Sequence, residues 1–348
     1  MFYLKYRPKT IQDLDNSNVK DVIANILKSK DLPHAFLFTG QKGTGKTSTA
    51  RIMAKAINCL NNAYGGKGDS IEPCNECANC KSIETSSSPD IIEMDAASNR
   101  GIDEIRSLIR DSSFAPITTR YRVFIIDEAH MITNDAFNAL LKTLEEPPVS
   151  VIFILATTNE EKVPKTIISR CTRVLFGRAK KQDILLRLEK IIAKENIKID
   201  KHVLEFIASH SESSFRDANK ILEELIIQNK TTLDEVKNYM GSYSNQNFLE
   251  IISKNQLKEA LLWVNEFTQN GGSIRFLLEE TLERLRTALL AKSGVQMEDE
   301  LDTSLTIKEI AVLMKLFNEA YGTLRISPIE SIPLEIAIVE FYNNKVIK

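Results

Sequence analysis

The chain has 348 residues, 43% of them hydrophobic and 26% charged, with a formal net charge of -2 at pH 7. This composition excludes a disordered or fibrous protein, and the length predicts two or three domains. The charge does not indicate a uniformly basic nucleic-acid binder, although local basic surfaces can still bind phosphates. Residues 1–8 show no secretory signal, and no apolar stretch reaches the roughly 18 residues of a membrane span, so we expect a cytoplasmic protein without a membrane partner.

Short apolar runs alternate with amphipathic segments in the first half of the chain. Nearly continuous apolar runs, typical of buried parallel strands, occur at residues 35–38, 91–94, 123–126 and 151–155. Apolar residues recur with helical spacing at residues 19–29, 48–58, 102–112 and 135–144. This alternation predicts an α/β domain over residues 1–177.

The second half of the chain is predicted to be helical. After residue 177 the strand signals fade, and apolar residues recur every three to four positions. The clearest polar break is Gly241–Asn245, so we predict a small helical domain over residues 178–241 and a second helical domain over 242–348. Amphipathic patterns in the latter cover residues 257–263, 274–290 and 307–321.

A phosphate-binding loop lies between the first predicted strand and the helix that follows it. Its residues are Gly40, Gln41, Lys42, Gly43, Thr44, Gly45, Lys46 and Thr47. Glycines let backbone N–H groups approach phosphate oxygens closely. Lys46 is expected to contact the β- and γ-phosphates, and the Thr47 hydroxyl is expected to bind Mg²⁺. A glycine-rich turn without a ligand is the alternative interpretation.

An acidic pair follows the predicted strand at residues 123–126. We expect the Asp127 carboxylate to join the magnesium site and Glu128 to orient or deprotonate the attacking water. A solvated acidic turn is the alternative. The next predicted strand leads to Thr158, the candidate sensor of the γ-phosphate, for which a helix cap is the alternative.

Four cysteines lie between the phosphate loop and the acidic pair. Cys74, Cys77 and Cys80 share a Cys-x-x-Cys-x-x-Cys spacing, and Cys59 precedes them across a connection. Four thiolates suit tetrahedral Zn²⁺ with no open coordination position, so the predicted metal site is structural. An empty reduced cluster is the alternative. Cys171 stands apart, within Ser169-Arg170-Cys171.

These motifs resemble the gamma/tau subunit family of bacterial DNA polymerase III, the ATPases of the sliding-clamp loader within the AAA+ superfamily. The resemblance spans most of the first 220 residues. It rests on the four cysteines and on residues 5–8, 40–47, 93–98, 126–130, 137–148 and 169–171.

The resemblance implies an AAA+ P-loop ATPase domain with a zinc-binding insertion, a helical lid and an all-α collar that holds an oligomer together. It implies ATP hydrolysis that loads the sliding clamp onto primed DNA, within the polymerase III holoenzyme but not by its polymerising subunit. The implied partners are other gamma/tau copies, the delta and delta-prime subunits, the beta clamp and primed DNA.

Residue roles also follow from the resemblance. Arg170 corresponds to an arginine finger that acts in trans on the ATP of a neighbouring subunit, and Arg216 corresponds to a second sensor. A guanidinium suits the first role because it is always charged and donates to several phosphoryl oxygens. The resemblance adds four residues to the nucleotide-binding set: Tyr6, Arg7, Pro8 and Ser48.

Two features differ from the family pattern. Residues 15–18 replace a Gly-Gln-Glu-like stretch near the adenine pocket, so the base contacts are left open. The long C-terminal extension of tau-type members is absent, so polymerase and helicase are not expected partners. Two alternatives share parts of the pattern: a non-catalytic scaffold like delta-prime, which the intact phosphate loop and Asp127-Glu128 disfavour, and an ATPase of recombination junctions, which would lack the cysteine insertion.

Overall fold

The computed structural model describes residues 1–29, 31–99, 101–233, 235–236, 245–254, 256–269, 272–295, 305–324 and 326–346. The chain folds into two compact units, Met1–Asn229 and Lys230–Lys348. The predicted break at 241–245 lies outside the described residues except for Asn245, so the division into three domains stays a prediction. No helix in the described part of the chain is long and apolar enough to cross a membrane.

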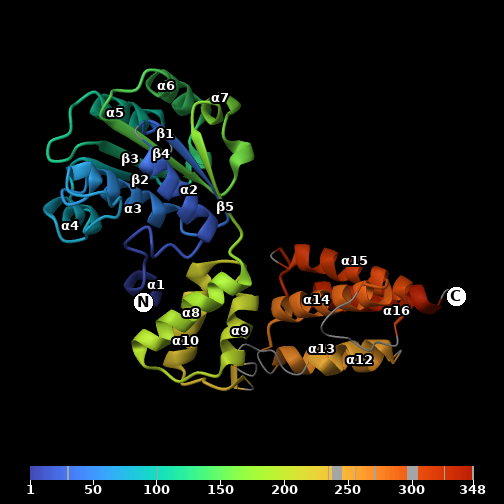
Figure 1. Ribbon diagram of the computed structural model, residues 1–348. Coiled ribbons are helices and arrows are strands. Elements are labelled where there is room, and N and C mark those ends of the chain that lie inside the picture. Colours follow the sequence, from blue (N-terminus) through green and yellow to red (C-terminus); the bar gives the residue numbers. More distant parts are fainter. Residues whose placement is uncertain are drawn as a thin grey trace. The chain divides into compact units, whose positions relative to one another are not determined.

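A five-stranded parallel sheet forms the centre of the first unit, with the strand order β2-β3-β4-β1-β5 (Figure 1). The strands are β1 (Ala35–Gly40), β2 (Ile91–Asp95), β3 (Arg122–Asp127), β4 (Val151–Thr157) and β5 (Thr172–Gly177). The predicted α/β class is confirmed. The sequence pattern did not indicate β5, because this edge strand alternates buried with exposed side chains and so has no continuous apolar run.

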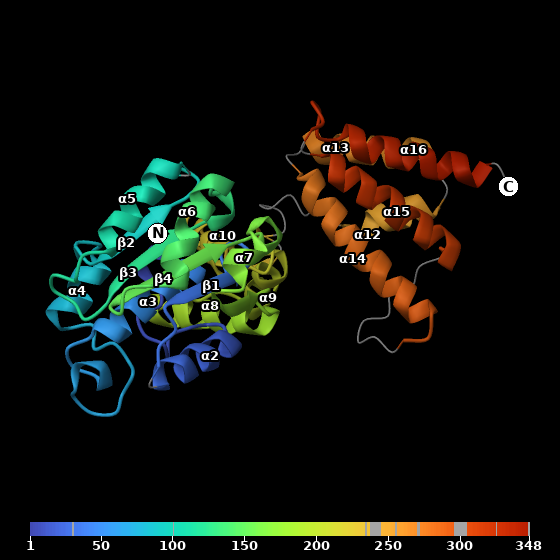
Figure 2. The same ribbon diagram turned by 90° about the horizontal axis from the view of Figure 1, so that it is seen from above.

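Helices cover both faces of the sheet (Figure 2). Side chains alternate along a strand, so Phe36 and Phe38 pack on one face while Leu37 packs on the other. The first face is covered by α2 (Ser17–Lys28) and α3 (Lys46–Asn58). The second face is covered by α5 (Ile102–Ser112), α6 (Asn134–Glu145) and α7 (Lys165–Ile168).

The four predicted helices of this domain are present, and each end lies within two residues of the prediction. Local caps set two of the starts. The Asn16 side chain accepts a hydrogen bond from the backbone N–H of Val19 at 3.2 Å, which begins α2. Gly45 begins α3 in the left-handed conformation.

The first unit also contains α4 (Ala78–Glu84), between β1 and β2 in the chain, and three helices after β5: α8 (Lys181–Glu195), α9 (Lys201–His210) and α10 (Phe215–Ile227). The short helix α1 (Phe2–Lys5) is attached to them by ion pairs. The amino terminus lies 3.0 Å from Glu223, and Lys5 Nζ lies 2.6 Å from Glu195. The helical region predicted after residue 177 is therefore present, and it packs with the chain's first residues.

The described residues of the second unit form helices around one apolar core. They are α12 (Asn245–Ser253), α13 (Leu257–Gln269), α14 (Ile274–Lys292), α15 (Ile307–Thr323) and α16 (Ile332–Val346). The predicted amphipathic patterns correspond to α13, α14 and α15. Thr306 and Glu309 form a reciprocal capping box at the start of α15, which satisfies two N–H groups at that helix end.

Candidate nucleotide site and cysteine cluster

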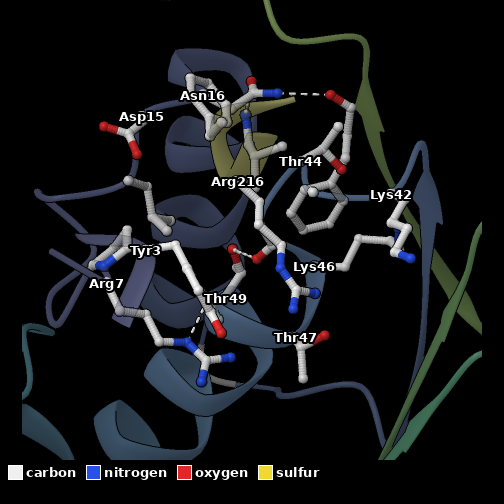
Figure 3. Close-up of a pocket in the computed structure, with 18 of the residues that line it drawn as sticks. Tyr3, Arg7, Asp15, Asn16, Lys42, Thr44, Lys46, Thr47, Thr49 and Arg216 are labelled. Carbon is white, nitrogen blue, oxygen red and sulfur yellow. Dashed lines mark hydrogen bonds between the residues drawn. The ribbon is translucent and has the colours of Figure 1, made fainter. Parts of the chain in front are cut away.

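The predicted nucleotide residues gather where three strands end. β1 ends at Gly40, β3 ends at Asp127, and β4 ends at Thr157. Because these strands are parallel and adjacent, their carboxyl ends meet at the same edge of the sheet, where open α/β sheets bind ligands. A pocket of about 410 Å³ opens there (Figure 3).

The pocket contains most of the predicted set. Among the described residues, its lining includes Arg7, Pro8, Lys42, Gly43, Thr44, Gly45, Lys46, Thr47, Ser48, Asp127, Glu128 and Arg216. Gly40, Gln41, Tyr6, Thr158 and Arg170 are not among the described residues that line it. The first two belong to the phosphate loop itself, and the others are placed below.

Lys46 lies folded back over the phosphate loop. Its ammonium donates to the carbonyl oxygens of Gly40 and Gln41, both at 2.8 Å. Burial lowers the pKa of Lys46, and the carboxylates of Glu128 and Asp127 oppose that shift. Within the described part of the chain, this buried cation is thus held directly by backbone carbonyls alone.

Two glycines of the loop meet constraints that no other residue satisfies without strain. Gly45 has φ of 100°, in the left-handed region that favours glycine. At Gly43, which has φ of 80°, an added Cβ would lie 2.0 Å from Ser214 Oγ and 3.2 Å from Arg216 Cβ. The phosphate loop therefore packs directly against the start of α10.

Thr47 and Asp127 are in direct contact. The Thr47 hydroxyl donates to Asp127 Oδ2 at 2.6 Å. A hydroxyl and a carboxylate at this spacing provide the oxygen ligands that Mg²⁺ takes beside phosphates. The donor set fits the predicted magnesium site.

Glu128 has an unusual backbone conformation for a carboxylate side chain, with φ of 47°. Its Oε2 accepts a hydrogen bond from the Thr158 hydroxyl at 3.1 Å and lies 3.4 Å from His130 Nδ1. His130 Nδ1 also lies 3.0 Å from Thr157 Oγ1. The candidate base and the candidate sensor are thus joined by a hydrogen bond. Glu128 lines the pocket, and Thr158 contacts it from outside the lining.

The side chain of Arg170 contacts other residues of its own chain. It follows α7, donates to the Thr166 carbonyl oxygen at 2.6 Å and forms an ion pair with Glu145 at the end of α6. The neighbouring Cys171 thiol has its pKa raised to about 12 by burial, so it is not a reactive group. Arg170 therefore lies apart from the phosphate loop of its own chain.

Another side of the pocket is built by α1 and α10. The Arg216 guanidinium lies over the Tyr3 ring, 5.0 Å from its centroid, and Arg7 Nε donates to Ser48 Oγ at 2.8 Å (Figure 3). Tyr6 instead donates its hydroxyl to Glu195 of α8. The sequence motifs did not indicate Tyr3, because an aromatic residue near a chain start carries no signal of its own.

Two further polar residues of the pocket, Arg187 and Asn219, were missed, whereas Asp15 belongs to the stretch 15–18 that the resemblance placed near the adenine pocket. Asp15 and Arg187 form a buried ion pair, with 3.1 Å between Arg187 Nη1 and Asp15 Oδ2, and Asn219 lies on α10. Burial raises the pKa of Asp15, and the Arg187 charge opposes that shift. Arg187 and Asn219 belong to helices whose sequence shows only amphipathic spacing, so no motif could have revealed them.

The four predicted cysteines converge on one point. The Sγ atoms of Cys59, Cys74, Cys77 and Cys80 all lie within 4.8 Å of one another. Tetrahedral zinc with Zn–S bonds of about 2.3 Å places its sulfur ligands about 3.8 Å apart. The cluster has the donor set and the spacing of a four-thiolate site.

Backbone N–H groups point at these sulfurs. The N–H of Cys77 donates to Cys74 Sγ at 3.3 Å, and that of Cys80 donates to Cys77 Sγ at 3.4 Å. Burial alone would raise the pKa of Cys74, but hydrogen bonds from the backbone N–H groups of Glu76 and Cys77 and from the Cys59 and Cys77 side chains lower it to about 6. The turn therefore favours the thiolate, the form that binds metal, at Cys74, whereas burial raises the pKa of Cys59 and of Cys80.

Together, the parallel sheet with its strand order, the phosphate loop between β1 and α3 and the acidic pair after β3 define a class. The protein has the AAA+ P-loop nucleotide-binding fold, extended by a cysteine cluster and further helices.

Proteins of similar sequence show which family within this class the chain belongs to. The chain is 37% identical over 357 residues to the DNA polymerase III subunit tau of Bacillus subtilis (strain 168), covering 97% of this chain and 62% of that protein. It is 32% identical over 360 residues to the DNA polymerase III subunit gamma of Buchnera aphidicola subsp. Baizongia pistaciae (strain Bp), covering 97% of this chain and 95% of that protein. The chain belongs to the DNA polymerase III gamma/tau family.

Two other comparisons complete the findings. A family model described as "DNA polymerase III, delta subunit" matches residues 15–180. The solved structure of the Thermotoga maritima RuvB Holliday junction branch migration motor superimposes with a TM-score of 0.48 at 16% identity, covering 71% of this chain and 79% of that one. The chain spans about three fifths of two of its tau-type relatives, 62% of one and 60% of the other.

Proposed function

We propose that this chain is an ATPase subunit of a bacterial clamp loader, which binds and hydrolyses ATP to load the beta clamp onto primed DNA. The observation that carries the proposal is the edge of the sheet where Lys46, Thr47, Asp127 and Glu128 surround one pocket. A scaffold that only holds other subunits has no need for this complete set. Membership of the gamma/tau family supports the replication context.

The phosphate loop would bind the triphosphate. Among the described residues, Lys46 has carbonyl partners and no ion pair, so its ammonium can turn to the β- and γ-phosphates without breaking an ion pair. Thr47 and Asp127 would hold Mg²⁺, which neutralises phosphate charge when bound. Their hydroxyl and carboxylate already lie within hydrogen-bond distance of each other.

Glu128 would orient the attacking water and accept its proton. Its carboxylate accepts a hydrogen bond from the hydroxyl of Thr158, the residue after β4, and lies close to His130. Binding of the γ-phosphate by Thr158 would affect Glu128, because a hydrogen bond joins the two side chains. Movement of the Thr158 hydroxyl toward a phosphate oxygen would release Glu128 for the water.

Arg170 would act on the ATP of a neighbouring subunit. In its own chain it is paired with Glu145 and does not line the pocket, so its charge is available to a second copy only when that ion pair opens. An arginine supplied in trans stabilises the negative charge that develops on the transferred phosphoryl group. Arg216, whose guanidinium lies over Tyr3, would contact the nucleotide of its own chain and couple it to the lid.

The proposal also assigns roles to the cysteine cluster, the helical domains and bound DNA. The cysteine cluster would hold a structural Zn²⁺, since four thiolates leave no position for water. Residues 178–241 would serve as the lid and 242–348 as a collar that joins gamma/tau copies with delta and delta-prime subunits. DNA would be contacted through its phosphates without base readout.

A mixing experiment tests the shared site. Arg170→Ala and Lys46→Ala chains, each assembled with clamp and primed DNA, should each lose at least about 100-fold in ATP turnover. An equal mixture should recover roughly a quarter of the parent rate, because one interface in four then joins an intact phosphate loop to an intact arginine.

Arg173→Ala provides the matched control, because Arg173 is a nearby exposed arginine that pairs with Glu160. This variant should keep the parent rate. If assembled Arg170→Ala also keeps the parent rate, the site is not shared. Absence of ATP binding by the parent chain would instead favour the scaffold function.

A further inference from the structure

One buried cation of the first unit has no role in the proposed hydrolysis of ATP. Lys55 lies on α3 and is 4% exposed. Its ammonium donates to the carbonyl oxygen of Lys9 at 2.9 Å and to Asn75 Oδ1 at 2.6 Å. Because both of these acceptors are neutral, a negative charge close by is needed to offset the cost of burying the ammonium.

The cysteine cluster supplies such a charge when it holds metal. Asn75 directly follows Cys74 in the Cys-x-x-Cys turn and has the left-handed conformation, with φ of 59°. Four thiolates around one Zn²⁺ leave a net negative charge. Burial lowers the pKa of Lys55, and the charges of Glu84 and Cys80 oppose that shift. The ammonium therefore lies where it stabilises the metal-bound form of the cluster.

The cysteine insertion, residues 59–84, also holds the segment that precedes α2. The Glu72 carboxylate accepts hydrogen bonds from the backbone N–H groups of Ile11 at 2.8 Å and Gln12 at 3.1 Å. The Lys9 ammonium lies 2.6 Å from the carboxylate of the last residue of α4. The insertion thus positions this stretch of backbone through its own side chains.

The same segment contributes side chains to the nucleotide pocket. Arg7 precedes the stretch held by the insertion, Asp15 and Asn16 follow it, and all three line the pocket (Figure 3). Arg7 Nε donates to Ser48 Oγ at the start of α3, about two helical turns before Lys55. The segment therefore runs between the pocket at one end of α3 and the cysteine cluster at the other.

We propose that Lys55 is a positioning residue that couples metal binding at the cysteine cluster to nucleotide binding. With the four thiolates joined through Zn²⁺, the turn that carries Asn75 is fixed. Lys55 and Glu72 then hold residues 9–12, which keeps Arg7 in the pocket. The inference rests on the proposed ATPase function and gives the metal a second role, because the metal-loaded chain binds ATP more tightly.

A linkage measurement tests the coupling in the full-length protein. Removal of zinc by a zinc-selective chelator should weaken ATP binding by about 5- to 20-fold. Since coupling between two binding sites is reciprocal, ATP should strengthen the retention of zinc against the chelator by the same factor. Equilibrium binding of a fluorescent ATP analogue and competition with a chromophoric chelator measure the two factors without relying on hydrolysis.

Two variants test the proposed connection. Lys55→Met removes the ammonium and keeps an apolar side chain, and Glu72→Ala removes the acceptor of two N–H groups. Each zinc-loaded variant should bind ATP more weakly than the parent, and removal of zinc should then change the affinity less than about twofold. Lys81→Met and Glu76→Ala are the matched controls, because these exposed residues of the insertion should leave the coupling unchanged.

Hydrogen exchange gives a measurement that does not depend on nucleotide. The N–H groups of Ile11 and Gln12 should exchange at least about tenfold faster after zinc removal, while those of β1 stay protected. Loss of protection throughout the sheet would contradict the proposal, because the metal would then stabilise the whole domain rather than this segment.

Equal ATP affinity of the folded chain with and without zinc overturns the coupling and leaves the ATPase proposal intact. Parent-like coupling in folded Lys55→Met overturns the assignment to Lys55. If the parent chain binds no ATP, the ATPase proposal fails and the inference fails with it.

Discussion

At the scale of single residues, Glu128 is the proposed catalytic base. Its left-handed backbone directs the side chain back toward β4, where Thr158 and His130 meet one carboxylate oxygen. The sequence predicted Glu128 and Thr158 separately, because each follows an apolar run. Their hydrogen bond depends on the register of β3 beside β4, which no local pattern contains.

Glu128→Gln should separate binding from hydrolysis. An amide preserves the shape and can still contact Thr158, but it cannot accept a proton from water. We expect ATP turnover to fall by about 100-fold or more while ATP affinity stays within about threefold. Equilibrium binding and single-turnover hydrolysis measure the two effects.

The exposed Glu161→Gln provides the control for that variant and should keep both properties. Normal turnover by assembled Glu128→Gln would assign the base to another residue.

At the scale of elements, a buried carboxylate anchors the loop between α5 and β3. Asp90 is fully buried and accepts hydrogen bonds from the backbone N–H groups of Ile117, Thr118 and Thr119 at 2.7 to 3.0 Å. Burial would raise the pKa of Asp90, but these donors lower it below its ordinary value. The loop conformation therefore depends on an ionised side chain.

Asp90→Asn should destabilise the protein by about 2–4 kcal/mol at pH 7, because an amide cannot accept all of these bonds. Since the folded-state pKa is depressed, this contribution is present above the unfolded-state value of about 3.9 and is lost as pH falls through the folded-state value. Urea unfolding at pH 7 and at low pH measures the change.

The difference between parent and Asp90→Asn should shrink in acid. Asp103→Asn, with a side chain that is 89% exposed, should show little effect at either pH. A difference that does not depend on pH would contradict the role of the Asp90 charge.

The cysteine cluster predicts a bound metal. We expect about one zinc per chain, with the thiolates held by the Cys74-to-Cys80 turn. Cys77→Ser should release the metal and lower the melting temperature, because metal binding and local folding are coupled. Mass spectrometry for metals and circular dichroism melting measure these effects.

Cys171→Ala is the matched control, because this half-buried cysteine lies outside the cluster. It should retain the metal. Full zinc content in Cys77→Ser, or no zinc in the parent chain purified with zinc present, would contradict the structural metal site.

At the scale of the whole molecule, every described residue of the nucleotide pocket belongs to the first compact unit. A fragment of residues 1–229 should therefore fold and bind ATP with nearly the affinity of the full chain. A fragment of residues 1–177 should bind at least about tenfold more weakly, because it lacks Arg187, Phe215, Arg216 and Asn219. Equilibrium binding of both fragments makes the comparison.

Circular dichroism establishes that each fragment is folded before its affinity is measured. Equal affinities of two folded fragments would show that the helices after residue 177 contribute nothing to binding. Weak binding by folded 1–229 would show that the second unit takes part in the site.

The sequence by itself determined the features that depend on neighbouring residues. Strand and helix alternation, the phosphate loop and the cysteine spacing are local patterns, so α2, α3, α5 and α6 lie within two residues of their predicted ends. Tertiary packing determined the contacts between residues that are distant in the sequence. Arg187 meets Asp15 across 172 positions, and Arg170 meets Glu145 across 25. Such contacts depend on how helices and strands assemble, so only the tertiary structure reveals which side chains line the pocket and which carboxylate pairs with Arg170.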